Sequence, residues 1–180
     1  MHQKLNIAMI LPPSVAYSEL VDCFDHGKGI GEAYPLSMPL GALHLLSCIE
    51  PLEETKFIGV LDYSLEYHEN KKHKSVDEYI DGIVNDLDFV PDVLGFTLIF
   101  STTHKFFDLC ANKLKSKWPN VKIVVGGTHA TNCPKEIFEN KNVDFLVRGE
   151  AEIAFPLLLQ AISKGADPEG ISIKGVYTRK

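Results

Sequence analysis

Short apolar runs, rich in β-branched residues, recur along the chain, and segments with helical periodicity separate them. The runs are nearly continuous rather than alternating, which is typical of strands that helices cover on both faces. They span residues 5–11, 56–61, 93–100, 121–125 and 143–147. Strand alternating with helix in this way predicts an α/β fold built on a parallel sheet.

Five segments between or after the runs have the spacing of amphipathic helices. They span residues 39–49, 75–87, 104–117, 134–139 and 151–163. Because crossovers between parallel strands are right-handed, we expect a doubly wound, five-stranded, flavodoxin-like sheet with strand order 2-1-3-4-5. The tail, residues 173–180, starts like a strand and then ends. No repeat or second domain is evident, so residues 1–180 are interpreted as a single domain.

Charge and hydropathy narrow the classes of partner. The 180 residues are 45% hydrophobic and carry a formal net charge of -6, which is unsuited to nucleic acid. The one basic cluster, Lys71–Lys74, is interpreted as a solvated loop. No run approaches the roughly 18 apolar residues of a membrane span, and the N-terminus lacks the pattern of a signal peptide. We therefore expect a cytoplasmic protein with reduced cysteines and no membrane partner.

Ligands of an open parallel sheet bind beyond the carboxyl ends of its strands, so the loops that follow the strands are the segments to read. Ser101–His104 places hydroxyls and an imidazole at the start of a helix, where unpaired N–H groups can bind an anion or a polar tail. Gly126 and Gly127 allow a backbone to approach a bulky flat ligand, although a tight turn without a ligand explains two glycines equally well. Arg148–Glu150 alone would be read as a surface ion pair.

Other motifs lack the surroundings that their chemistry needs. Gly27–Gly31 (GKGIG) resembles a phosphate loop, but about fifteen residues separate it from the first strand, which a dinucleotide fingerprint follows directly. Asp22, Asp25 and His26 match no spacing of a metal site, and we expect a flexible loop there. No G-x-S-x-G elbow is present. We therefore identify no catalytic residue and no metal ligand.

Four segments in order carry a resemblance to a known family: residues 39–41 (PLG), 91–96 (PDVLGF), 124–131 (VVGGTHAT, then Pro134) and 143–150 (VDFLVRGE, then Glu152). Together they resemble the N-terminal domain of the B12-binding radical-SAM family over nearly the whole chain, from about Ile7 to about Tyr177. The chain departs from the family pattern at Thr97, Thr128 and Ala151, where serine, proline and glycine are usual.

The resemblance implies a flavodoxin-like cobalamin-binding domain, with the corrin ring over the carboxyl edge of the sheet and the nucleotide tail inside. It places Gly126 and Gly127 beside the tail, and Thr97 with Ser101–Thr103 as hydroxyls that bind it. The candidate cofactor-binding residues are Thr97, Ser101, Thr102, Thr103, Gly126, Gly127, Thr128, His129, Arg148, Gly149 and Glu150.

Two motifs are missing. D-x-H-x-x-G, whose histidine binds cobalt from below in methionine-synthase-like domains, is absent, and Pro12–Val15 stands in its place. The resemblance therefore implies cobalamin without that histidine ligand. None of the four cysteines forms the C-x-x-x-C-x-x-C motif that holds a radical-SAM cluster. We expect SAM and the 4Fe-4S cluster in a C-terminal radical-SAM domain, with this chain as an N-terminal fragment of a methyltransferase-type enzyme.

Two alternatives stay open. One is a structural or docking domain of the same fold that does not bind cobalamin. The other is a flavin-binding or receiver protein, which the sequence disfavours. Pro12–Ser14 is a poor phosphate loop, and Phe100–Ser101 stands where a receiver needs an aspartate.

Overall fold

A computed structural model describes residues 3–27, 38–69, 73–85, 87–166 and 168–179. Its sheet has the order β2-β1-β3-β4-β5-β6. The strands are β1 (Leu5–Leu11), β2 (Thr55–Asp62), β3 (Val93–Thr97), β4 (Lys122–Gly126), β5 (Phe145–Val147) and β6 (Val176–Thr178). The first five are parallel, which confirms the predicted order 2-1-3-4-5. The expected count of five is wrong by one, because β6 pairs antiparallel with β5.

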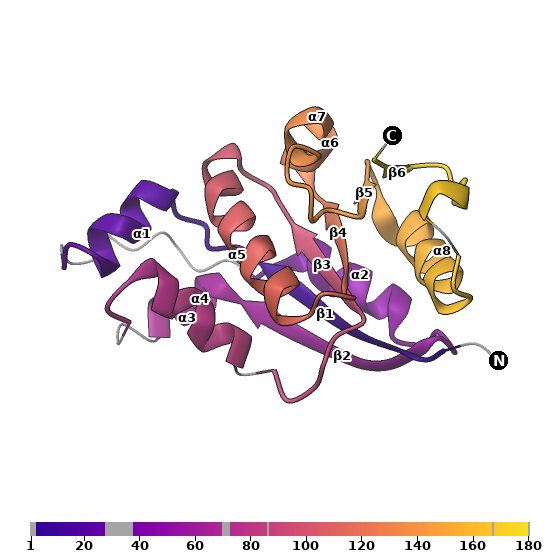
Figure 1. The fold of residues 1–180 in the computed structure, drawn as a ribbon, viewed down its shortest axis with the longest axis horizontal. Coiled ribbons are helices and arrows are strands. Elements are labelled where there is room, and N and C mark those ends of the chain that lie inside the picture. The colour runs from indigo at the N-terminus through magenta and orange to yellow at the C-terminus, as the bar shows by residue number, and fades with distance from the viewer. Residues whose placement is uncertain (1–2, 28–37, 70–72, 86, 167, 180) are drawn as a thin grey trace.

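Helices cover both faces of the sheet (Figure 1). One face carries α2 (Leu40–Ile49) and α8 (Ala151–Ser163). The other carries α1 (Tyr17–Phe24), α3 (Tyr63–Glu69), α4 (Val76–Asn85) and α5 (His104–Lys117). Two short helices, α6 (Thr128–Asn132) and α7 (Pro134–Ile137), follow β4. No helix in the described ranges has the length and apolar character needed to cross a bilayer.

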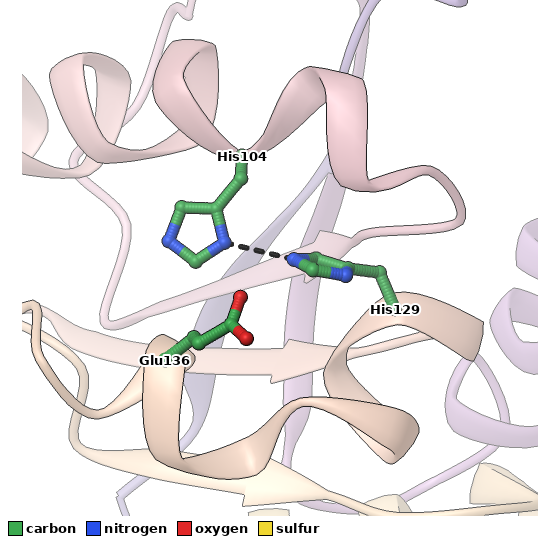
Figure 2. Close-up of side chains that lie close together, drawn as sticks. All are labelled: His104, His129 and Glu136. Atoms are coloured by element: carbon green, nitrogen blue, oxygen red, sulfur yellow. Dashed lines mark hydrogen bonds between the residues drawn. The ribbon is translucent and has the colours of Figure 1, made fainter.

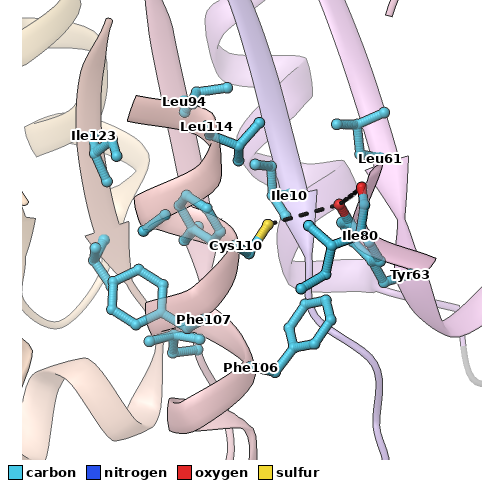
Figure 3. Packing of buried hydrophobic residues seen from close by; sticks show 14 of the residues in the cluster. Ile10, Leu61, Tyr63, Ile80, Leu94, Phe106, Phe107, Cys110, Leu114 and Ile123 are labelled. Carbon is cyan, nitrogen blue, oxygen red and sulfur yellow. Dashed lines mark hydrogen bonds between the residues drawn. The ribbon is translucent and has the colours of Figure 1, made fainter. Parts of the chain in front are cut away.

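The larger core cluster lies between the sheet and the α3–α4–α5 layer (Figure 3). Tyr63, Phe106 and Phe107 are fully buried there. The Tyr63 hydroxyl donates a hydrogen bond to the Ile80 carbonyl at 3.2 Å, and the Cys110 thiol donates to the Tyr63 oxygen at 3.6 Å. These contacts satisfy the polar atoms that the aromatic core encloses.

Two helices lie in segments where no helix was expected. Residues 12–38 and 62–74 contain α1 and α3, which are only two turns long and bury few side chains each. Asp22, Asp25 and His26 do not lie in a flexible loop: His26 Nδ1 is 3.1 Å from Asp22 Oδ1, and Asp25 accepts the Val76 N–H at 2.9 Å. Most of the Gly27–Gly31 motif, and Lys71 with Lys72, lie outside the described residues.

Strand β3 is shorter than expected because the chain turns after Thr97. The Leu98 N–H donates to the Gly126 carbonyl at 2.8 Å, and the next two side chains, Ile99 and Phe100, are 53% and 52% exposed. A 3₁₀ turn at Ser101–Thr103 then leads into α5. The expected strand is therefore too long, because Leu98, Ile99 and Phe100 continue the apolar run beyond the end of β3.

Candidate ligand-binding pocket

A cavity of about 470 Å³ opens at the carboxyl ends of β3, β4 and β5, beneath α2 and α8. Its deep wall is apolar and includes Met9, Val124 and Phe155. Polar side chains lie among the residues that line it: Thr97, Thr128, Thr131, Asn132, Glu150 and Glu152. An apolar interior with a few polar groups in this position is typical of a ligand site in a doubly wound sheet.

Several glycines line this cavity. A Cβ atom added at Gly41 or Gly149 would meet nothing within 4 Å, and one added at Gly126 would meet only the Val147 carbonyl oxygen, at 3.6 Å. All three residues line the cavity. A Cβ atom at these positions would therefore project into space that no other described residue fills.

Gly127 also lines the cavity, but the fold itself requires it. Its φ is +98°, a conformation that L-residues with side chains rarely adopt. An added Cβ would overlap the backbone of Leu98, whose carbonyl accepts the His129 N–H at 3.0 Å. The turn alone therefore explains why a glycine stands at Gly127. At Gly126 neither the φ angle nor a close contact requires a glycine.

The structure brings about half of the predicted site residues together around the cavity. These are Thr97, Gly126, Gly127, Thr128, Gly149 and Glu150. The remaining ones are outside its lining: Ser101 and Thr102 are exposed on the 3₁₀ turn, Arg148 is exposed after β5, and Thr103 and His129 are buried. The Thr103 hydroxyl donates to the Phe100 carbonyl at 2.8 Å. Contact of these five with a ligand stays a prediction.

Sequence reasoning missed lining residues on the two covering helices and on α6. Gly41 and Leu45 come from α2, and Glu152 and Phe155 from α8. Thr131, within the motif of residues 124–131, accepts the Gly149 N–H at 3.0 Å and so ties α6 to the loop after β5. The PLG segment, which contains Gly41, and Glu152 belong to the family motifs of this chain. Those motifs are the sequence signal that points to these two lining residues.

Beside the cavity, His129 lies against His104 at the start of α5 (Figure 2). His104 Nδ1 is 2.8 Å from His129 Nε2. Burial, followed by the charge of His104, lowers the pKa of His129, while the charge of Glu136 acts in the opposite direction. Burial and the charge of His104 thus both disfavour the imidazolium form of His129.

Comparison with known families decides how this pocket is interpreted. A family model described as the B12 binding domain matches residues 65–159. This chain belongs to the B12-binding domain family. The match includes β3, β4, β5 and α6, whose ends and residues line the cavity.

Relatives of this B12-binding domain are larger proteins. An uncharacterised methyltransferase of Pyrococcus horikoshii is 29% identical over 168 residues, which are 93% of this chain and 31% of the relative. The cobalamin-dependent radical SAM methyltransferase TokK of Streptomyces tokunonensis is 35% identical over 106 residues, or 58% of this chain and 14% of TokK. The chain thus spans less than a third of these relatives.

Solved structures share the fold. The radical S-adenosylmethionine methyltransferase TsrM of Kitasatospora setae, with cobalamin and a [4Fe-4S] cluster bound, covers 99% of this chain with 28% of its own, at TM-score 0.68 and 18% identity. The cobalamin-dependent S-adenosylmethionine radical enzyme OxsB covers 96% of this chain with 20% of its own, at TM-score 0.65 and 14% identity. At these identities the likeness shows a common architecture.

Proposed function

We propose that this B12-binding domain holds cobalamin with its nucleotide tail in the 470 Å³ cavity and its corrin ring outside, over the carboxyl edge of the sheet. The observation that carries the proposal is a cavity lined by Gly41, Gly126 and Gly149 at the carboxyl edge of the sheet, in a chain of this family. A cavity of this size suits the tail and is too small for the whole cofactor.

The chemistry of the lining fits such a tail. Met9, Val124 and Phe155 offer an apolar wall to a flat aromatic base. Thr97 and Thr128 carry hydroxyls that can bind ribose or phosphate oxygens. Ile99, which lines the cavity and is 53% exposed, offers an apolar surface to the ring.

Pro12–Val15, directly after β1, contains no histidine, so in this proposal the ring binds without an imidazole from that motif position. Ser14 lies there, and its backbone N–H donates to Ser64 Oγ at 2.9 Å while the two hydroxyls lie 3.0 Å apart. His129, on α6, points toward His104 (Figure 2). Cobalamin, when bound, would supply a cobalt centre able to carry a methyl group. The domain's own residues would hold and orient it without the D-x-H-x-x-G histidine.

The catalytic step belongs, in this proposal, to a C-terminal radical-SAM domain of the same polypeptide that holds SAM and the 4Fe-4S cluster. Support comes from the relatives, which are named as methyltransferases and of which this chain matches less than a third. The candidate residues in this chain bind and position cofactor and are not assigned a chemical step.

Retention of cobalamin by the purified 180-residue chain tests the proposal. The chain is mixed with hydroxocobalamin, gel-filtered, and its visible spectrum recorded under oxidising and reducing conditions. We expect about one cobalamin per chain. No retained absorbance under either condition would refute cobalamin binding and would favour the cobalamin-free docking domain.

A matched pair of variants locates the site. Gly126→Val places a side chain in the cavity, and we expect it to abolish retention with little change in the thermal midpoint. Gly170→Val is the control: a Cβ there meets nothing within 4 Å, just as one at Gly126 makes no close contact, but the residue lies in the 3₁₀ turn at Pro168–Gly170, outside the lining. Equal retention by the two variants would show that cobalamin binds elsewhere.

A further inference from the structure

Three potential metal ligands from three successive helices lie close together (Figure 2). One of them is in α6, which also lines the proposed cobalamin pocket. They are His104 at the start of α5, His129 in α6 and Glu136 in α7. One donor atom from each lies within 4.8 Å of the others. None of the three lines the cavity, so this cluster is a separate feature of the fold.

We propose that His104, His129 and Glu136 bind one Zn²⁺ ion. Imidazole nitrogen and carboxylate oxygen are preferred zinc ligands, at about 2.0–2.2 Å, and three protein ligands leave a fourth position for water. Two nitrogens on one tetrahedral zinc stand roughly 3.3 Å apart, by that geometry. The two ring nitrogens are 2.8 Å apart, so a small rotation of either ring accommodates the ion.

The surroundings of His104 support a ligand role. Its Nε2 lies 3.4 Å from Asp108 Oδ2, one turn further along α5. Asp108 is itself held, because its Oδ1 accepts a hydrogen bond from Asn140 Nδ2 at 2.9 Å. A carboxylate only accepts, so it favours the proton on Nε2 and leaves the Nδ1 lone pair facing His129. A carboxylate on the far nitrogen of a histidine is the usual support of a zinc ligand.

The protons balance without an added reactant. With Nδ1 of His104 as acceptor, the 2.8 Å contact requires His129 Nε2 to carry its proton in the metal-free chain. Zinc binding moves that proton to His129 Nδ1 through solvent, and both inward nitrogens then present lone pairs to the ion. Glu136 is exposed, so its carboxylate can turn toward the metal at little cost.

A bound ion would link α6 and α7 to α5 through its three ligands. The same helix α6 presents Thr128, Thr131 and Asn132 to the cavity. The ion would thus stabilise one wall of the pocket from outside without competing with cobalamin for ligands. An ordinary hydrogen bond between two histidines, with no metal, is the alternative that the experiment must separate.

The test uses the tag-free chain, stripped with a chelator and free of cobalamin, in equilibrium dialysis against Zn²⁺ with the bound metal quantified. We expect one zinc per chain. His104→Gln and Glu136→Gln should each abolish or strongly weaken binding, and Asp108→Asn should weaken it about 10–100-fold. Glu139→Gln, an exposed neighbour on the same segment, and His26→Gln are the controls that should bind as the parent does.

Circular dichroism and the thermal midpoint show whether each variant is folded. Because Glu136 is exposed, Glu136→Gln is the variant least expected to disturb folding. Co²⁺ in place of Zn²⁺ adds a spectroscopic check, because four-coordinate cobalt has intense visible bands that Glu136→Gln should remove. Failure of the parent chain to retain zinc at micromolar concentration, or unchanged binding by both His104→Gln and Glu136→Gln, would overturn the proposal.

Discussion

Adjacent glycines of one motif should respond in opposite ways to the same substitution. At Gly127, alanine must adopt a φ of +98° and its Cβ must overlap the Leu98 backbone. The conformation alone costs about 1–2 kcal/mol, and the overlap adds overpacking of about 1–3 kcal/mol. We therefore expect Gly127→Ala to lower the free energy of unfolding by roughly 2–5 kcal/mol, from the sum of these two costs.

At Gly126 the added methyl meets only the Val147 carbonyl oxygen, at an ordinary 3.6 Å, and φ is not positive. Alanine there restricts the unfolded chain and should change stability by about 0 to +1 kcal/mol. Urea denaturation of the two variants beside the parent measures both values. Similar losses of stability in the two variants would refute the reasoning, because they would mean that the turn does not discriminate between its glycines.

Two further predictions concern polar groups, one buried and one partly buried. Burial raises the pKa of the Cys110 thiol from 9.0 to about 12, so the unfolded chain releases this proton first and stability falls as pH rises past 9. Cys110→Ala should remove about 1 kcal/mol of the loss between pH 9 and 10, and an unchanged slope in urea titrations would contradict this. Asp144 accepts the Ile123 N–H at 2.9 Å and lies 3.1 Å from Lys115 Nζ. Asp144→Ala should lower the free energy of unfolding by about 2 kcal/mol. A decrease below about 0.5 kcal/mol would show that these two contacts do not stabilise the fold.

The parallel core of the fold was predictable because its local signal repeats along the chain. Every strand buried on both faces gave an apolar run, and right-handed crossovers left the doubly wound arrangements, among which the order 2-1-3-4-5 was favoured. The missed elements are those with little signal of their own. β6 has three residues and alternates in exposure, and α3 has only seven residues and begins directly after β2.

The candidate site was harder to predict because half of its walls come from helix faces. Gly41 of α2 and Glu152 of α8 line the cavity, and only the packing of those two helices on one face of the sheet brings them together. Loop reading finds residues that follow a strand, such as Thr97 and Gly126. It cannot find residues whose position depends on how two distant helices meet.

The motif of residues 124–131 shows why its members separate in space. In the short helix α6, residues spaced by three or four share a face. Thr128, Thr131 and Asn132 have that spacing and line the cavity. His129 does not line the cavity; it is 6% exposed and lies against His104 instead. Sequence neighbours of one motif thus serve two places, the proposed cobalamin pocket and the proposed zinc ligands. The two proposals can therefore be tested separately. A variant of a zinc ligand leaves the cavity glycines unchanged, and its loss of bound zinc can be measured directly.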